Sequence, residues 1–145
     1  MVTWPPKTIL HATDFSPNAE HAFHVACQIA RSMHARIVVL HAFILDAHIT
    51  ADLPVVPREL VSEEDIRLKL RQIRESEPSL QIEDKFVVGT PVESIVSVAN
   101  SCHADLIIMG TYGRTGFKRL VLGSVADHVL RRASCPVMIV PLPPA

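Results

Sequence analysis

Short apolar segments alternate with longer amphipathic segments along the whole chain, and this alternation constrains the fold more than any other feature. Five segments are short and apolar, as is typical of strands that a sheet buries on both faces. In the segments between them, apolar residues recur at three- and four-residue steps, which predicts helices. The pattern therefore predicts an α/β fold in which helices cover both faces of a five-stranded parallel sheet.

The expected strands cover residues 8–12, 36–42, 82–88, 106–109 and 136–140, and the expected helices cover 17–33, 59–76, 91–101 and 125–132. The third strand is the least apolar and is expected at an edge of the sheet. Residues 43–57 are expected to be irregular. Ser16 is the expected N-cap of the first helix, with proline at the next position. Capping boxes are predicted where the sequences from Thr90 and Ser124 start a helix.

The length of 145 residues suits one domain, expected to span residues 1–145. Apolar residues make up 48% of the chain and charged residues 20%, which is ordinary for a globular protein. The net charge of −1 gives no overall attraction to nucleic acid or to acidic membranes, so neither is an expected partner. No apolar run is long enough to span a membrane.

The amino-terminal sequence MVTWPPK lacks the layout of a signal peptide. The three cysteines, Cys27, Cys102 and Cys135, are scattered and form no CxxC pair. Such a set suits reduced thiols in the cytoplasm better than disulfides or a zinc site. His21 and His24 lie three residues apart on a helix, but no third ligand is evident, so no metal site is expected.

Glycine and positive charge are concentrated after the fourth strand. Four of the five glycines lie between residues 110 and 123, and no acidic residue lies between Asp105 and Asp127. In open parallel sheets, ligands bind beyond the carboxyl ends of the strands. A glycine-rich loop that leads into a helix can turn its backbone N–H groups toward phosphate. The glycines are Gly110, Gly113, Gly116 and Gly123, and the cations are Arg114, Lys118 and Arg119.

Two better-known phosphate motifs do not fit this loop. A P-loop needs a Gly-Lys pair, and none occurs in the chain. A Rossmann fingerprint would follow the first strand, whereas this loop follows the fourth. The alternative is a tight turn that binds nothing, and the cations in it would then be solvated. For Asp14, after the first strand, the alternative to a ligand contact is an Asx turn or helix cap beside Ser16.

The spacing Gly110-x2-Gly113-x9-Gly123-Ser124 resembles the nucleotide-binding signature of the universal stress protein family. The resemblance extends over the chain through TILHATDFS, VVLHA, VGTPVESIV, ADLIIMGTYGRTG and LGSVADHVLRRASCPVMIVP. It implies a flavodoxin-like, Rossmann-like three-layer sandwich with strand order 3-2-1-4-5. It also implies that ATP, with Mg²⁺, binds across the carboxyl ends of the first and fourth strands.

By this resemblance, one group of residues surrounds the adenine and ribose and another cradles the phosphates. Ala42 is smaller than the valine expected there, which leaves a looser wall near the base. His11 and His41 lie within strands, where hydrogen-bonded core histidines are expected rather than metal ligands. The residues expected to contact the nucleotide are Ala12, Thr13, Asp14, Ala42, Met109, Gly110, Gly113, Arg114, Gly116, Gly123, Ser124 and Val125.

The expected function is that of an ATP-binding stress protein, a nucleotide-dependent regulator rather than an efficient catalyst. No nucleophile elbow and no suitably spaced pair of acids appears, and Asp14 is the only acid placed at the site. Two alternatives remain open: a slow ATPase or autokinase, and an adaptor that binds no nucleotide. The last strand, Val137–Val140, resembles the segment through which family members pair, so a homodimer is expected. The alternative is that this strand is buried within the monomer.

Overall fold

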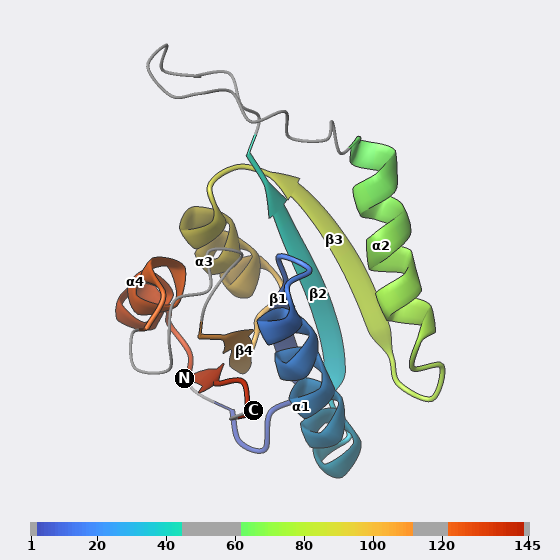
Figure 1. Ribbon diagram of the computed structural model, residues 1–145. Helices are drawn as coiled ribbons and strands as arrows, with labels where there is room; N and C mark the ends of the chain where they lie inside the picture. Colours follow the sequence, from blue (N-terminus) through green and yellow to red (C-terminus); the bar gives the residue numbers. More distant parts are fainter. Residues whose placement is uncertain (1–2, 45–61, 112–121, 144–145) are drawn as a thin grey trace.

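The computed structural model describes residues 3–44, 62–111 and 122–143, and these residues form a five-stranded parallel sheet. The strand order is β3-β2-β1-β4-β5, and every neighbouring pair is parallel (Figure 1). This confirms the α/β fold and the expected order 3-2-1-4-5. β3 lies at one edge, as its composition predicted, and β5 lies at the other.

Most elements begin and end within a residue or two of their expected positions. β2 and β4 each continue one residue further than expected, and β5 starts one residue later. The strands are β1 (Thr8–Ala12), β2 (Arg36–Phe43), β3 (Ile82–Val88), β4 (Leu106–Gly110) and β5 (Val137–Val140). The helices are α1 (Pro17–Met33), α2 (Glu63–Glu75), α3 (Pro91–Ser101) and α4 (Ser124–Arg132). The irregular segment expected at 43–57 lies outside the described residues from 45 onward.

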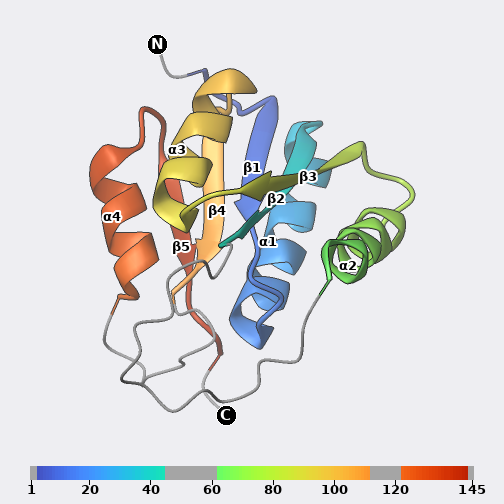
Figure 2. The ribbon, with the colours of Figure 1, turned by 90° about the horizontal axis from the view of Figure 1, so that it is seen from above.

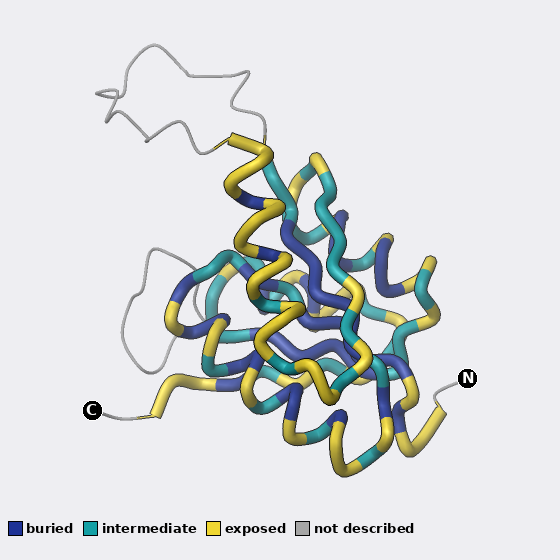
Figure 3. Tube along the Cα trace, turned by 90° about the vertical axis from the view of Figure 1, so that its right-hand side faces the viewer, coloured by how far each residue is buried: buried dark blue, intermediate teal, exposed yellow. Residues whose placement is uncertain are grey.

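Two hydrophobic clusters sandwich the sheet. Because successive strand residues point to opposite faces, Ile9 packs in the cluster under α1 and α2, whereas Leu10 packs in the cluster under α3 and α4. Figure 2 shows α1 and α2 on one face and α3 and α4 on the other. The central strands are buried, and the outer side of α2 is exposed along its length (Figure 3). The buried core therefore fixes the relative positions of the strand ends.

The hydrogen bonds at the helix starts show which of the predicted N-caps are correct. The Ser16 hydroxyl accepts a hydrogen bond from the Ala19 amide at 3.3 Å, as expected for an N-cap. The two predicted capping boxes are wrong. Thr90 is the N-cap of α3 but makes no side-chain cap bond, and Ser124 is the first residue of α4, after the N-cap Gly123.

A capping box does form at the start of α2, where none was predicted. Ser62 and Asp65 exchange side-chain and backbone hydrogen bonds, at 3.2 and 3.3 Å. The helix therefore begins at Glu63 rather than at residue 59. Ser62 and Asp65 have the same spacing of hydroxyl and acidic residue as the two sequences for which a capping box was wrongly predicted. The many charged residues around them make the start of α2 hard to recognise from the sequence.

His11 lies in the core between β1 and β4. Its Nδ1 lies 3.0 Å from the Ile108 carbonyl oxygen, and since a carbonyl can only accept, Nδ1–H is the donor. The ring lies 5.6 Å from that of Phe23. Complete burial lowers the pKa of His11 from its ordinary value of 6.5 to about 4, so the ring is neutral at pH 7. The expected core role is confirmed.

The buried His11 makes stability depend on pH. Because the pKa is about 4 in the folded protein and 6.5 in the unfolded chain, stability is constant above pH 6.5 and falls as the pH drops toward 4. Between pH 7 and pH 5 we expect this group to cost about 2 kcal/mol of unfolding free energy. Urea unfolding of the wild type and of His11→Asn at both pH values measures the difference. The exposed His24→Asn serves as control, and an equal pH dependence in all three proteins would contradict the prediction.

Candidate functional site

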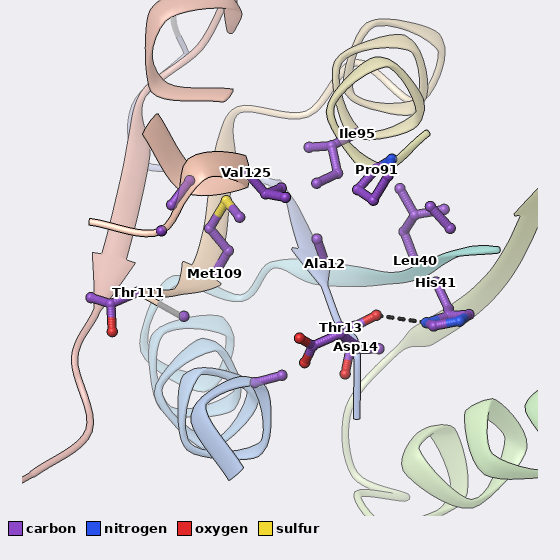
Figure 4. A pocket seen from close by; sticks show the side chains of 15 residues that line it. Ala12, Thr13, Asp14, Leu40, His41, Pro91, Ile95, Met109, Thr111 and Val125 are labelled. Carbon is purple, nitrogen blue, oxygen red and sulfur yellow. Dashed lines mark hydrogen bonds between the residues drawn. The ribbon is translucent and has the colours of Figure 1, made fainter. Parts of the chain in front are cut away.

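A pocket opens at the carboxyl ends of β1, β2 and β4, beneath the first turns of α3 and α4 (Figure 4). One wall is apolar and comes from strand ends and from helices α1, α3 and α4. The other lining residues come from the turn after β1, from the last residues of β2 and β4 or just beyond them, and from the N-cap of α4. The apolar lining consists of Ala12, Ala19, Leu40, Ala42, Pro91, Ile95, Met109, Val125 and Ala126. The remaining lining residues are Thr13, Asp14, His41, Gly110, Thr111 and Gly123.

The structure brings together most of the residues that the sequence predicted for one site. Ser124 is exposed and does not line the pocket. Gly113, Arg114 and Gly116 lie outside the described residues. Eight predicted residues line the pocket: Ala12, Thr13, Asp14, Ala42, Met109, Gly110, Gly123 and Val125. Their part in binding a ligand stays a prediction.

The turn after β1 carries the acidic group of the pocket. The Asp14 carboxylate accepts a hydrogen bond from the Ser16 amide at 2.9 Å, and the Thr13 hydroxyl accepts one from the Phe15 amide at 3.0 Å. Asp14 therefore forms the Asx turn that was the alternative interpretation of this residue. Asp14 also lines the pocket, and its contact with a ligand stays a prediction. Phe15 adopts a left-handed conformation with φ of 64°, which is uncommon for a residue other than glycine.

Gly110, at the end of β4, packs closely against α1. A Cβ atom at this position would lie 3.1 Å from the backbone carbon and oxygen of Asn18, in the first turn of α1. Backbone atoms cannot move aside as the tip of a flexible side chain can. The absence of a side chain at Gly110 thus lets α1 approach the sheet beside the pocket.

The two described ends of the glycine-rich connection meet at the pocket. The Gly123 amide donates to the Thr111 carbonyl oxygen at 2.7 Å. This amide already has an acceptor in the structure, so the phosphate cradle that the family resemblance implies around Gly123 would use other N–H groups. Within α4, the first amide bonded to the N-cap carbonyl is that of Asp127. The preceding amides, at Ser124 and Val125, are among those that a helix start leaves without intrahelical partners.

Seven of the fifteen pocket residues were not predicted from the sequence, and two of them, His41 and Pro91, have recognisable signals. His41 immediately precedes the predicted Ala42 on β2 and is 8% exposed. Its Nδ1 lies 2.8 Å from the Thr13 carbonyl oxygen (dashed in Figure 4). Pro91 opens α3 directly after β3, and a helix that starts there must begin above the carboxyl ends of the strands. Both could have been found from the parallel topology.

Neither a metal site nor a membrane span is found in the described part of the chain. No group of three or more histidine, cysteine or acidic side chains is placed to hold a metal ion in residues 3–44, 62–111 and 122–143. In the same residues, no helix has both the length and the apolar character needed to cross a bilayer.

These features define a class of proteins: open, doubly wound α/β sheets with a ligand pocket at the switch in strand order. In this sheet β1 and β4 are neighbours, and the chain runs outward from them in both directions. The pocket lies at their carboxyl ends, where such sheets bind ligands.

The comparison with known proteins identifies the family. A model of the Universal stress protein family matches residues 6–141, so the chain belongs to the universal stress protein family. A universal stress protein from Methanocaldococcus jannaschii is 34% identical over 143 residues, which cover 94% of this chain and 83% of that protein. The resemblance found in the sequence is thereby confirmed.

Solved structures of the family have the same fold. Universal stress protein UspA from Lactobacillus plantarum is 27% identical, with a TM-score of 0.77 over 92% of this chain and 97% of that one. A universal stress protein solved in complex with cAMP is 28% identical, with a TM-score of 0.71 over 93% and 96% of the two chains.

The contact between Gly110 and Asn18 can be tested by one substitution. Because Gly110→Ala forces a Cβ atom against helix backbone, we expect it to lower the unfolding free energy by about 1–3 kcal/mol. Urea denaturation followed by circular dichroism measures this loss. Ser134→Ala, at an exposed position, is the control and should change little. An unchanged unfolding free energy for Gly110→Ala would show that the helix and strand do not approach so closely.

Proposed function

We propose that this universal stress protein binds ATP, together with Mg²⁺, in the pocket at the ends of β1 and β4 and acts as a nucleotide-dependent regulator of a stress response. The observation that carries the proposal is the pocket itself, which joins an apolar wall, an acidic turn and the two ends of the glycine-rich connection. The relative solved in complex with cAMP supports an adenine nucleotide as the ligand.

The two kinds of pocket wall suit the two halves of a nucleotide. Ala12, Ala42 and Met109 offer apolar surface to the flat base. The Asp14 carboxylate can accept hydrogen bonds from ribose hydroxyls. The amino terminus of α4 and the connection containing Gly113 would hold the phosphates, through backbone N–H groups and the helix dipole.

Mg²⁺ fits this site as an ion bound mainly by the nucleotide. Among the described residues that line the pocket, Asp14 is the one carboxylate, and it accepts the Ser16 amide. Mg²⁺ in nucleotide sites commonly keeps several waters and takes its other oxygen ligands from phosphates and one or two carboxylates. When bound, it would neutralise phosphate charge, and Asp14 would face either the ion or the ribose.

The proposal also places the protein in the cytoplasm as a single domain that spans the chain. Cys27, Cys102 and Cys135 are all free thiols in the structure, which suits a reducing compartment. Burial raises the pKa of Cys27 to about 11 and also raises the pKa values of the other two thiols. All three are therefore largely protonated and unreactive near neutral pH.

The first test of ATP binding is whether Mg·ATP raises the thermal stability of the protein. With Mg·ATP at 100 times its Kd, we expect about 2.7 kcal/mol of added stability and a rise of several degrees in Tm. Denatured wild-type protein should also release an adenine nucleotide that chromatography identifies. Gly113→Val and Gly123→Val should abolish both effects while circular dichroism stays near wild type, and Ser134→Ala should retain both.

The alternatives predict other results in the same experiment. No rise in Tm and no released nucleotide would favour an adaptor that works through protein contacts alone. ATP turnover above that of Gly113→Val would favour the slow ATPase. Loss of fold in both glycine variants would mean that these glycines serve the turn itself.

We further propose that the protein forms a homodimer through β5. β5 is an edge strand, so among the residues that the structure describes no strand pairs with one side of its backbone. Met138 is 36% exposed, and Val137 and Ile139 are half-buried. An exposed apolar edge favours association with another strand, and pairing with a second copy would cover it.

The homodimer is tested by a charge on the exposed edge. Met138→Lys places an ammonium group in the proposed contact, so we expect the variant to sediment as a monomer at micromolar concentrations at which the wild type is a dimer. Leu68→Lys, at an exposed apolar residue of α2, is the matched control and should leave the dimer intact. A monomeric wild type would contradict the proposal.

A further inference from the structure

His41 is a buried histidine in the wall of the pocket. It lies near the end of β2, and its Nδ1 is 2.8 Å from the carbonyl oxygen of Thr13, which follows β1 (Figure 4). Since a carbonyl oxygen has no hydrogen to donate, the Nδ1–H group of His41 is the donor. The bond ties the turn after β1 to the neighbouring strand.

Three polar groups of Thr13 are held by hydrogen bonds. Its amide donates to the Leu40 carbonyl at 2.9 Å, which continues the sheet. Its hydroxyl accepts the Phe15 amide at 3.0 Å. The Thr13 carbonyl oxygen accepts a hydrogen bond from the Nδ1–H group of His41. This carbonyl belongs to the peptide bond between Thr13 and Asp14. The peptide bond that precedes Asp14 is thereby held in place by a side chain of β2.

Phe15 follows Asp14 in the chain and also contacts His41. Its left-handed conformation is unfavourable for a side chain with a Cβ, so the surroundings must supply compensating contacts. The Phe15 ring stacks on the His41 ring, with centroids 4.5 Å apart and an angle of 29° between the planes. The Lys69 ammonium of α2 lies 5.3 Å from the Phe15 ring centroid. Asp14 thus lies between two residues that both contact His41.

We propose that His41 is a positioning residue of the nucleotide site, which holds the Thr13 carbonyl so that the Asp14 carboxylate stays in the pocket. The inference rests on the proposed function, because it assigns His41 a part in binding ATP. His41 acts through Asp14 and through the course of the backbone. The geometry also separates two contributions, a hydrogen bond through Nδ1 and a ring stacked on Phe15.

A second buried histidine provides an internal comparison. His11 also donates Nδ1–H to a backbone carbonyl, that of Ile108, at 3.0 Å. It does not line the pocket, however, and its bond ties β1 to β4 within the core. Loss of the His11 bond should therefore affect stability without a specific effect on the nucleotide.

The two contributions of His41 are separated by two substitutions. Asparagine carries its amide nitrogen about where the histidine Nδ1 lies, so His41→Asn keeps a donor and loses the ring. His41→Phe keeps a ring against Phe15 and loses the donor. By calorimetry at a temperature where all variants are folded, we expect His41→Phe to bind Mg·ATP about tenfold more weakly. His41→Asn should lose clearly less, and His11→Phe should bind like the wild type.

A residue that only filled space would give the reverse order, with affinity retained in His41→Phe and lost in His41→Asn, and that result would overturn the inference. The effect of His41→Phe should also disappear in an Asp14→Ala background, because His41 acts through Asp14. An undiminished effect in that background would overturn it too.

Amide hydrogen exchange gives a readout that needs no ligand. His41→Phe should speed exchange at Phe15, whose amide is bonded within the turn, whereas His11→Phe should not. Equal exchange in the wild type and both variants would overturn the positioning role. The two proposals fail separately: a wild type that binds no ATP contradicts the proposed function, whereas ATP binding of equal strength in every histidine variant contradicts only the inference about His41.

Discussion

The pairing of β1 with β4 is the constraint on which the site depends. These strands are separated by nearly a hundred residues, yet Ile9 lies beside Leu106 and His11 beside Ile108 in a parallel register. Both are buried on two faces by apolar clusters, so neither can slip without moving side chains out of the core. The parallel direction then brings the turn after β1 and the connection after β4 to the same edge of the sheet, where the pocket forms.

Several residues at this edge serve the fold and the pocket together. Asp14 accepts the Ser16 amide and lines the pocket, and Gly110 allows α1 to approach the sheet while its own surface faces the cavity. The bond from Gly123 to Thr111 holds together the two described ends of the glycine-rich connection. The site is thus built largely from backbone and turn geometry, and the protein needs few dedicated polar side chains to form it.

Much of the fold could be predicted from the sequence, because buried strands and amphipathic helices have different periodicities. The strand order came only from the family resemblance, since no periodicity specifies which strands are neighbours. Helix starts were less predictable: Ser62 forms a capping box, while Thr90, with the same local signal, does not. For the site, the sequence predicted pocket residues that lie next to Asp14 or near the glycines at and after the end of β4. His41 was missed because its contact with Thr13 crosses between strands: only the parallel topology, and no local sequence pattern, brings the two residues together.

The central claim is that the pocket at the ends of β1 and β4 holds an adenine nucleotide. A crystal structure of the protein grown with excess Mg·ATP tests this most directly. The expected result is a base against Ala12 and Ala42, a ribose beside Asp14, and phosphates at the amino terminus of α4. A well-resolved structure in which the nucleotide binds elsewhere, or in which side chains fill this pocket under saturating Mg·ATP, would contradict the claim.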